Sequence, residues 1–440
     1  MRKLYIETYG CQMNVADSQL IAGQLAGLGY ETTDSAVEAD VILVNTCAIR
    51  ENAEVRVWGR LAQLAEHKQQ RPGLTLGLVG CMAQHLRDKI QAQAPYVDLV
   101  VGPDAYRRLG DILLTERDAP FVDVRLDRGE VYEGLDPRSD NGLTAFVTVE
   151  RGCDKFCSFC IVPYVRGRER SVPLAEVLRA VRRLVADGVR EVTLLGQTVN
   201  AWRDGEHDFA DLLRAVAAIE GLARVRFTSP HPADFNDRMV AAMADCAAVM
   251  PHLHLPLQSA ADGVLERMNR GYTYDDYRRL VDRFRAAVPD LALTTDLIVG
   301  FCGETEADYQ RTLAAIDEIG WDAAFMFLYS ARSGTKAAGW PDDVPAAEKT
   351  RRLEAVIARQ EAVSARLNAG LVGRCCEVLV EGRAKRGNGW YGRTPQFKNA
   401  VFESAEAPAM GQLVTVEVQQ TTAHTLIGRA VPAAVEVGAA

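Results

Sequence analysis

The stretch Cys153-Asp154-Lys155-Phe156-Cys157-Ser158-Phe159-Cys160 places three cysteines on one short segment, in the spacing C-x3-C-x2-C. It closely follows an apolar run at residues 146–149, which predicts a buried strand. Three thiolates on one loop can ligate three irons of a four-iron cluster and leave the fourth iron open to a small molecule. Zinc would require a fourth Cys or His, and the next histidine along the chain is His207. The alternative, a reduced cysteine loop without metal, is disfavoured by the spacing and the position.

The strand at residues 146–149 is the first of a series of βα units. Predicted strands, each followed by a helical stretch, lie at residues 146–149, 191–195, 225–228, 253–257, 295–299 and 325–329. Such a series implies a closed or partly closed barrel or a wide open sheet, with functional residues at the C-terminal strand ends in either case. Gly196 and Gln197 follow the second strand, and Gly300 and Gly303 follow the fifth. They are candidates for cofactor contacts, with a helix-capping loop and an ordinary glycine turn as the respective alternatives.

A shorter βα rhythm precedes this series. Strands are predicted at residues 4–6, 41–44, 74–79 and 97–101, and helices at residues 17–28, 52–68 and 84–93. The pattern predicts a parallel sheet covered by helices. The charged segment 127–142, which contains Pro and Gly, predicts a linker between the two series.

Three further cysteines, Cys11, Cys47 and Cys81, each follow one of the predicted N-terminal strands. Their separation excludes a local metal finger, but in a parallel sheet all three would project from the C-terminal edge, where doubly wound sheets gather ligands. The alternative is three separate buried fillers, as free Cys often is. Because all three recur beside Gly or Thr at strand ends, we favour metal ligands. The other cysteines, Cys246, Cys302, Cys375 and Cys376, show no pattern and are expected to be packing residues.

The C-terminal part has a different character. A charged helix is predicted at residues 346–368, and short strands at residues 376–380, 390–394, 400–402, 414–418 and 426–430. These strands predict a small antiparallel barrel. The last residues, 431–440, are expected to be a frayed tail.

A basic cluster without Asp or Glu lies at residues 382–400 within this barrel. It contains Arg383, Lys385, Arg386, Arg393 and Lys398, interleaved with Trp390, Tyr391 and Phe397. Cations for phosphates and aromatic faces for bases are what a surface for single-stranded RNA needs. The alternative is a solvated barrel edge whose aromatic residues belong to the core.

Length and composition limit the number of domains and the class of protein. The 440 residues suggest about three domains, and 48% hydrophobic with 25% charged residues is ordinary for globular proteins. We find no signal-peptide core and no apolar segment long enough for a membrane helix, so we expect a cytoplasmic protein without a membrane partner. In a reducing compartment closely spaced cysteines bind metal or react rather than form disulfides. The net charge of -9 argues against a wholly basic nucleic-acid binder but permits a local patch.

The C-x3-C-x2-C loop after the first barrel strand resembles the signature of the radical S-adenosylmethionine (SAM) enzymes. The resemblance implies that the open iron at Cys153, Cys157 and Cys160 binds the amine and carboxylate of SAM, and that Phe159 lies near its adenine. Both cysteine sets and the small terminal barrel are similar to the methylthiotransferase subgroup. That likeness implies a methylthiotransferase N-terminal domain at residues 1–120, a partial (β/α)6 radical SAM barrel at 139–370 and a TRAM domain at 372–435.

Three further motifs, at residues 8–14, 45–51 and 254–259, resemble those of the methylthiotransferases that modify isopentenyl-adenosine at position 37 of tRNA. Ile49-Arg50-Glu51 is the most telling part. The sequence departs from the pattern at Cys302, where the family usually has proline, and at residues 330–335, which lack two usual prolines.

The resemblance implies two 4Fe-4S clusters and two uses of SAM. One SAM methylates a sulfur at the Cys11, Cys47, Cys81 cluster, and the other yields a radical that abstracts the hydrogen from adenine C2. The implied partners are a tRNA anticodon stem-loop and an electron donor such as flavodoxin or ferredoxin, and we expect a monomer. No separate catalytic side chain is identified.

Alternatives remain within and outside this class. Sister methylthiotransferases act on threonylcarbamoyl-adenosine in tRNA or on a ribosomal-protein aspartate, and the latter predicts no basic cluster in the terminal barrel. A non-catalytic iron–sulfur electron carrier normally closes its cluster with four cysteines, which the sets of three disfavour.

Overall fold

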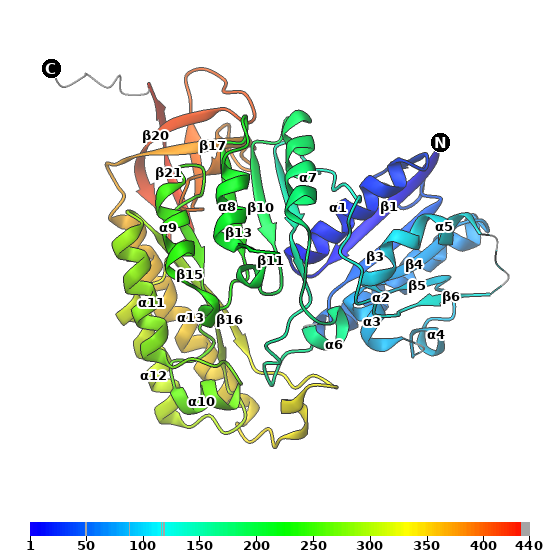
Figure 1. The fold of residues 1–440 in the computed structure, drawn as a ribbon, viewed down its shortest axis with the longest axis horizontal. Helices are drawn as coiled ribbons and strands as arrows, with labels where there is room; N and C mark the ends of the chain where they lie inside the picture. Colours follow the sequence, from blue (N-terminus) through cyan, green and yellow to red (C-terminus); the bar gives the residue numbers. More distant parts are fainter. Residues whose placement is uncertain (49–50, 88, 116, 118, 433–440) are drawn as a thin grey trace. The chain divides into compact units, whose positions relative to one another are not determined.

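Parallel strands form the sheet of the N-terminal region (Figure 1). The computed structural model describes residues 1–48, 51–87, 89–115, 117 and 119–432, and this sheet has the order β2-β1-β3-β4-β5-β6. Its strands are β1 (Arg2–Tyr9), β2 (Tyr30–Thr32), β3 (Val41–Thr46), β4 (Thr75–Gly80), β5 (Leu99–Val101) and β6 (Phe121–Asp123). Its helices are α1 (Gln12–Ala26), α2 (Glu51–Gln70), α3 (Cys81–Leu86), α4 (Lys89–Gln93), η1 (Pro103–Arg108) and α5 (Leu109–Leu114).

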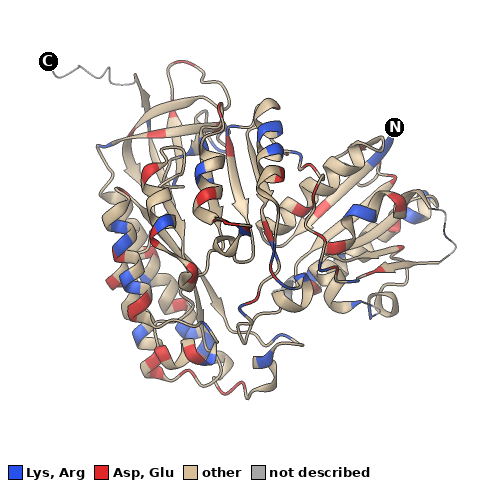
Figure 2. Cartoon of the chain, in the orientation of Figure 1, with Lys and Arg blue, Asp and Glu red and all other residues tan. Residues whose placement is uncertain are grey.

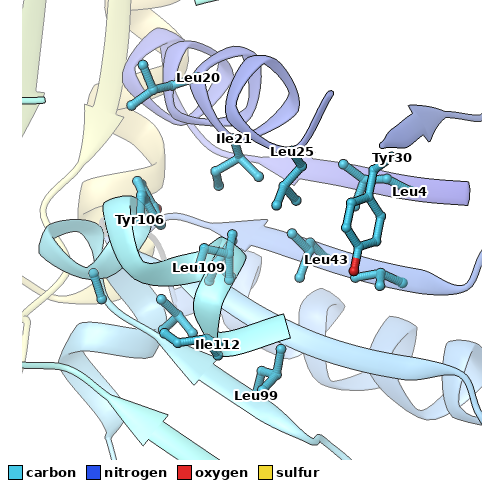
Figure 3. Packing of buried hydrophobic residues seen from close by; sticks show 14 of the residues in the cluster. Leu4, Leu20, Ile21, Leu25, Tyr30, Leu43, Leu99, Tyr106, Leu109 and Ile112 are labelled. Carbon is cyan, nitrogen blue, oxygen red and sulfur yellow. The ribbon is translucent and has the colours of Figure 1, made fainter. Parts of the chain in front are cut away.

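This sheet is buried on both faces. Leu43 of β3 clusters with Leu25 of α1 and Leu109 of α5 on one face, as Figure 3 shows. The neighbouring strand residues Ile42 and Val44 belong to a second core cluster. Successive strand residues point to opposite faces, so helices on both sides account for the continuous apolar runs from which the strands were predicted.

Local capping explains where the N-terminal helices differ from the prediction. Helix α1 begins at Gln12 rather than at residue 17, because the Cys11 amide donates to Asn14 Oδ1 (3.3 Å) at the helix start. The helix predicted at residues 84–93 is two helices, α3 and α4, interrupted near Arg87, whose φ is +49°. The elements β2, β6, η1 and α5 were not predicted, because they are too short to show a clear period.

Each predicted strand of the central βα series has a counterpart, although the strand expected at residues 253–257 covers only His252–His254. One three-stranded sheet has the order β13-β10-β7, and another has the order β14-β15-β16. Their bounds are β7 (Thr144–Thr148), β10 (Glu191–Leu195), β13 (Arg224–Thr228), β14 (His252–His254), β15 (Ala292–Val299) and β16 (Ala323–Leu328). The pairs β7 with β10, β14 with β15 and β15 with β16 are parallel, as βα units require.

Helices and minor strands complete this region. The helices are α6 (Val162–Arg166), α7 (Leu174–Ala186), α8 (Phe209–Ala217), α9 (Asp237–Asp245), α10 (Asp262–Arg267), α11 (Tyr274–Ala287) and α12 (Glu306–Ile319), with short turns η2 (Val199–Ala201), η3 (Pro232–Asp234) and η4 (Lys336–Gly339). Two antiparallel pairs join β8 (Glu150–Arg151) to β9 (Arg170–Ser171) and β11 (Arg203–Asp204) to β12 (His207–Asp208).

The C-terminal strands close into a barrel of order β17-β18-β19-β21-β20. It follows α13 (Ala346–Ala369) and consists of β17 (Cys375–Arg383), β18 (Trp390–Arg393), β19 (Asn399–Glu403), β20 (Leu413–Thr421) and β21 (Thr425–Val431). The expectation of a wholly antiparallel barrel is wrong for one pair, since β19 and β21 run parallel. Residues 433–435 of the expected domain 372–435, and most of the expected tail 431–440, lie outside the described residues.

The chain divides into two compact units. The first comprises Met1–Gly221, Phe227–Pro230 and Ser330–Trp340, and the second comprises Leu222–Arg226, His231–Tyr329 and Pro341–Ala440. The expected linker 127–142 lacks helix and strand, yet Glu130 and Tyr132 within it are buried in the first unit. The described part of the chain contains no helix long and apolar enough to cross a membrane. The predicted fold class, an α/β multidomain chain ending in a small β-barrel, is confirmed.

Candidate functional site

The loop that carries Cys153, Cys157 and Cys160 follows β7 and the short strand β8, as predicted. Cys153 and Cys157 are buried and Cys160 is half-buried. The loop turns at Gly152, where φ is +83° and an added Cβ would lie 2.0 Å from the backbone oxygen of Arg168. Farther along, the Cys160 amide donates to the Cys157 carbonyl at 2.9 Å. The backbone thus holds the three thiols on one tight loop.

The segment after β10 lies against this cysteine loop. Thr198 Oγ1 is 3.2 Å from Cys153 Sγ, and the Gly152 amide donates to the side-chain oxygen of Gln197. The amides of Gln197 and Thr198 donate to Glu150 Oε2, at 2.6 and 2.9 Å. A Cβ at Gly196 would lie 2.6 Å from that same oxygen. The two predicted residues Gly196 and Gln197 therefore do lie next to the cysteine loop.

Two buried polar atoms beside this loop lack a hydrogen-bond partner within the described residues. They are Gln197 Nε2, a donor, and Glu150 Oε1, an acceptor when ionised. Burial raises the pKa of Glu150 to about 8 and that of Cys153 to about 11. Buried polar groups nearly always have a hydrogen-bond partner. A ligand that offers an acceptor to Gln197 Nε2 and a donor to Glu150 Oε1 would therefore complete this site.

The second cysteine set lies at the C-terminal ends of neighbouring strands. Cys11 follows β1, Cys47 follows β3 and Cys81 begins α3 directly after β4. The strands are in register just before the cysteines, because Tyr9 pairs with Thr46 and Thr46 pairs with Gly80. The Cys47 amide donates to the Tyr9 carbonyl at 3.0 Å. The sheet therefore brings these distant positions to one edge, as predicted.

The thiols of this set interact with one another. A hydrogen bond from Cys47, helped by the charge of Arg166, lowers the pKa of Cys11 to about 6. Burial raises the pKa of Cys81, and the Cys11 charge contributes in the same direction. The thiolate is the form of cysteine that binds metal, so a low pKa at Cys11 favours ligation.

Among the described residues, neither cysteine set forms a site for a single metal ion. In the described ranges, no three His, Cys, Asp or Glu side chains form a group that could hold one metal ion. Thiolates that ligate three different irons of a cluster stand farther apart than the ligands of one zinc ion. The thiols of both sets are the donors that an iron–sulfur cluster requires.

Three family models match the chain. Residues 3–102 match the Uncharacterized protein family UPF0004, residues 147–316 match the Radical SAM superfamily and residues 370–431 match the TRAM domain. Each model falls on a region that the fold distinguishes: the six-stranded sheet, the βα series and the closed barrel.

Relatives match over nearly the full length. The tRNA-2-methylthio-N(6)-dimethylallyladenosine synthase of Chloroherpeton thalassium is 43% identical over 433 residues, covering 97% of this chain and 96% of the relative. The protein of the same name from Cereibacter sphaeroides is 44% identical over 432 residues, covering 97% and 98%. The chain belongs to the tRNA-2-methylthio-N(6)-dimethylallyladenosine synthase family. Its radical SAM membership implies SAM and a 4Fe-4S cluster as cofactors, as the sequence analysis predicted.

Solved structures share the fold of this synthase family member. The radical SAM methyltransferase TsrM of Kitasatospora setae, with cobalamin and a 4Fe-4S cluster bound, has a TM-score of 0.56 and 15% identity, covering 76% of this chain and 77% of that chain. The cobalamin-dependent SAM radical enzyme OxsB has a TM-score of 0.54 and 11% identity, covering 81% and 56%. At such identities the likeness concerns the fold alone.

Arg166 and Asp17 are two site residues that the sequence analysis missed. Arg166 Nε donates to Cys81 Sγ at 3.2 Å, and Arg166 Nη2 donates to Asp17 Oδ2 at 2.6 Å. Both side chains are almost fully buried. A signal was present in the sequence, since Asp17 is a charged residue on the apolar, buried face of α1 beside Met13 and Leu20.

Gly300 and Gly303 lie in the second unit, in the loop after β15. A Cβ at Gly300 would lie 2.4 Å from Lys349 Cγ, and the Gly300 amide donates to Glu304 Oε1 at 2.9 Å. The Gly303 amide donates to Asp343 Oδ1 at 2.7 Å. Glycine is required at position 300 because the Lys349 side chain lies too close for a Cβ, and the amides of both glycines hold the turn after β15.

The five predicted RNA contacts fall into two groups. Arg383, Lys385 and Arg386 are exposed, and the Arg383 guanidinium lies 3.8 Å from the Trp390 ring centroid. Arg393 and Lys398 are only 23% and 14% exposed at their side chains and form ion pairs with Glu381 and Asp322. Two of the five predicted cations are therefore ion-paired within the chain, whereas the other three are exposed to solvent.

The remaining charged residues and cysteines lie outside the two cysteine sets. Figure 2 shows Lys and Arg interspersed with Asp and Glu along α11, α12 and α13. Cys302, where the family usually has proline, is buried, whereas Cys375 is exposed, so the packing role expected for it is wrong. Ile49 and Arg50, the telling motif residues, lie outside the described residues.

Proposed function

We propose that this chain replaces the C2 hydrogen of N6-(dimethylallyl)adenosine at position 37 of tRNA by a methylthio group. The observation that carries the proposal is the near-full-length identity to synthases of that name, combined with a three-cysteine loop after the first barrel strand. When bound, the iron–sulfur clusters and SAM supply the radical and the methylated sulfur.

In this proposal each cysteine set holds one 4Fe-4S cluster. Cys153, Cys157 and Cys160 hold the cluster that binds SAM, and a second cluster is held by Cys11, Cys47 and Cys81. The strand-end placement and the low pKa of Cys11 support the second site.

The chain's own groups would orient SAM beside Cys153. The unpartnered Gln197 Nε2 and Glu150 Oε1 support contacts to its carboxylate and amine. We propose Phe159, Gly196, Gln197, Gly300 and Gly303 as SAM-contacting residues. Burial of Cys153 and Cys157 would exclude water from the reaction.

The remaining assignments follow from the same activity. We propose that the N-terminal, radical SAM and TRAM domains span residues 1–120, 139–370 and 372–435, although β6 at Phe121–Asp123 extends the first sheet slightly. A tRNA anticodon stem-loop would be the substrate, with flavodoxin or ferredoxin as electron donor. We propose that the protein acts as a cytoplasmic monomer.

The function is tested by nucleoside mass spectrometry of bulk tRNA from a strain that lacks this gene. We expect 2-methylthio-N6-(dimethylallyl)adenosine to disappear, its unmodified precursor to accumulate, and the wild-type gene but not Cys157→Ala to restore it. Loss of the methylthio group from threonylcarbamoyl-adenosine instead would select the alternative substrate. Unchanged tRNA would remove the proposal.

We propose that the basic cluster at residues 382–400 binds RNA mainly through its exposed cations. Changing Arg383, Lys385 and Arg386 to Ala should weaken tRNA binding and lower the slope of log affinity against log salt by about 0.7 per lost phosphate contact. Arg278→Ala with Arg279→Ala, on the exposed face of α11, is the matched control. Arg393→Glu with Lys398→Glu should mainly lower stability, because both side chains are ion-paired. An unchanged slope for the triple variant would place RNA binding elsewhere.

A further inference from the structure

Helix α6 begins two residues after the cysteine loop and extends toward the other cysteine set. Its residue Val165, together with Ile161 just before the helix, forms a buried cluster with Ala48 and Cys81. Ala48 is the neighbour of Cys47 in the sequence. The segment that follows one set of cysteines therefore forms an apolar wall of the other.

The last residue of α6, Arg166, places a cation in this wall. Its Nε donates to Cys81 Sγ at 3.2 Å, while Nη1 and Nη2 donate to Asp17 at 3.3 and 2.6 Å. The side chains of Arg166 and Asp17 are 3% and 0% exposed. Burial of a charged pair is costly unless further hydrogen bonds satisfy it, so this arrangement indicates a defined role for the guanidinium.

Two buried tyrosines lie beside the carboxylate that holds Arg166. The Tyr106 hydroxyl donates to Asp17 Oδ2 at 3.5 Å, and the Tyr132 hydroxyl lies 3.4 Å from Asp17 Oδ1. The Tyr132 hydroxyl is also 3.0 Å from the Pro103 carbonyl. With both Nη groups committed to Asp17, the planar guanidinium directs Nε at the sulfur of Cys81.

We propose that Arg166 is a positioning residue of the second cluster, which donates a hydrogen bond to the Cys81 thiolate and raises the cluster's reduction potential. The inference rests on the proposed function, because it requires Cys81 to be an iron ligand. Reduction adds negative charge to a cluster, and a fixed cation bonded to a ligand sulfur stabilises that charge. The same bond holds the thiolate in its ligating orientation.

The test isolates the second cluster in the full-length chain. Cys153, Cys157 and Cys160 are all changed to Ala, the protein is reconstituted anaerobically, and its iron content and EPR-monitored reduction potential are measured. Arg166→Met is then introduced together with Asp17→Asn, so that neither charge is left unpaired. We expect iron to be retained and the reduction equilibrium to shift on the order of tenfold toward the oxidised cluster, about 59 mV for one electron.

Two further variants make the result specific. Arg166→Lys keeps the charge without the fork geometry and should give a smaller shift in the same direction; it also serves if the double variant does not fold. Arg108→Met removes an Arg–Asp pair of the N-terminal region, in which Nε and Nη2 donate to Asp123 at 3.0 and 2.8 Å, and should leave the potential unchanged.

The outcomes separate this inference from the proposed function. If the variant without Cys153, Cys157 and Cys160 binds no iron, the second cluster itself is refuted. If it binds iron and the potential is the same with Arg166 replaced, or shifts equally with Arg108→Met, the role of Arg166 is refuted.

Discussion

The two sets of cysteines are assembled in opposite ways. Cys153, Cys157 and Cys160 lie on one loop and are held by local turns, whereas Cys11, Cys47 and Cys81 come from three neighbouring strands and meet only when the sheet forms. Their electrostatic settings differ as well. Burial raises the pKa of Cys153 to about 11, but the hydrogen bond from Cys47 lowers that of Cys11 to about 6. The same ligand type is thus prepared by local geometry in one place and by tertiary structure in the other.

The largest expected effect comes from the locally built set. We expect Cys157→Ala to abolish 5'-deoxyadenosine formation by the anaerobically reconstituted protein, because two thiolates cannot hold a cluster with one defined open iron. The iron of the strand-end set should remain, since its ligands follow β1, β3 and β4, which belong to a different sheet. Undiminished SAM cleavage would remove the assignment of this loop.

Cys47→Ala should separate the two sets more sharply. We expect one cluster's worth of iron to be lost, SAM cleavage to persist and no methylthiolated nucleoside to form. The measurements are iron content, 5'-deoxyadenosine and nucleoside mass spectrometry on the same sample. Wild-type iron together with normal product would return Cys11, Cys47 and Cys81 to the role of core packing.

The contrast also explains what could be predicted from the sequence. The loop of residues 153–160 was found from spacing alone, because its ligands are neighbours in the chain. Cys11, Cys47 and Cys81 could be grouped only by assuming parallel strands, whose C-terminal ends share an edge. The six strands of the central series were found because βα periodicity extends over long segments, whereas three-residue strands such as β2 carry no period.

Partners that depend on tertiary contacts could not be predicted in this way. Arg166 is one of three arginines in residues 166–170, and nothing local in the sequence links it to Cys81. Lys398 likewise looked free for RNA, although its amine bonds Asp322 at 2.6 Å and Asn368 at 2.9 Å. Ion pairing between distant segments leaves no local pattern in the sequence. A cluster of basic residues in the sequence therefore overestimates the number of cations that are available to bind RNA.

The rates of alkylation in the metal-free protein should reflect the lowered pKa of Cys11 and the raised pKa of Cys153. At pH 7 the thiolate fraction alone would favour Cys11 over Cys153 by about ten-thousandfold, and the lower nucleophilicity of a low-pKa thiolate reduces this to on the order of 50-fold. Timed iodoacetamide labelling under anaerobic conditions, followed by peptide mass spectrometry, measures both rates. Burial of Cys153 acts in the same direction.

The pH profile provides the control for this comparison. Labelling of Cys11 should level off above about pH 7, where a thiol with a pKa of about 6 is almost fully ionised, while labelling of Cys153 should still rise up to about pH 11. Cys375, which is exposed, serves as the internal reference for reagent access. Equal rates at Cys11 and Cys153 near neutral pH would contradict the proposed electrostatic difference.

The smallest expected difference concerns the glycines that precede a cysteine of each set. Gly152→Ala would bring Cβ to 2.0 Å from the Arg168 backbone oxygen, whereas Gly10→Ala meets Asn14 Oδ1 at 2.3 Å and Cys47 Cβ at 2.7 Å. The Asn14 amide can rotate away from an added Cβ, whereas the Arg168 backbone oxygen and Cys47 Cβ can move only with their backbones. Because the closest contact at Gly10 is the movable one, we expect Gly152→Ala to cost about 3 kcal/mol and Gly10→Ala roughly 1–2 kcal/mol less. Denaturant unfolding of the metal-free variants measures the difference.

Gly205→Ala separates strain from collision in this last test. Gly205 has a φ of +58°, and an added Cβ would meet nothing within 4 Å, so its substitution carries only the cost of the left-handed backbone, about 1 kcal/mol. The iron content then locates each effect, because Gly10→Ala displaces Cys47 and should lower the iron of the strand-end set while SAM cleavage persists. If Gly10→Ala instead destabilised the chain more than Gly152→Ala, the locally built loop would be the more adaptable site, and the contrast between local and tertiary assembly would be reversed.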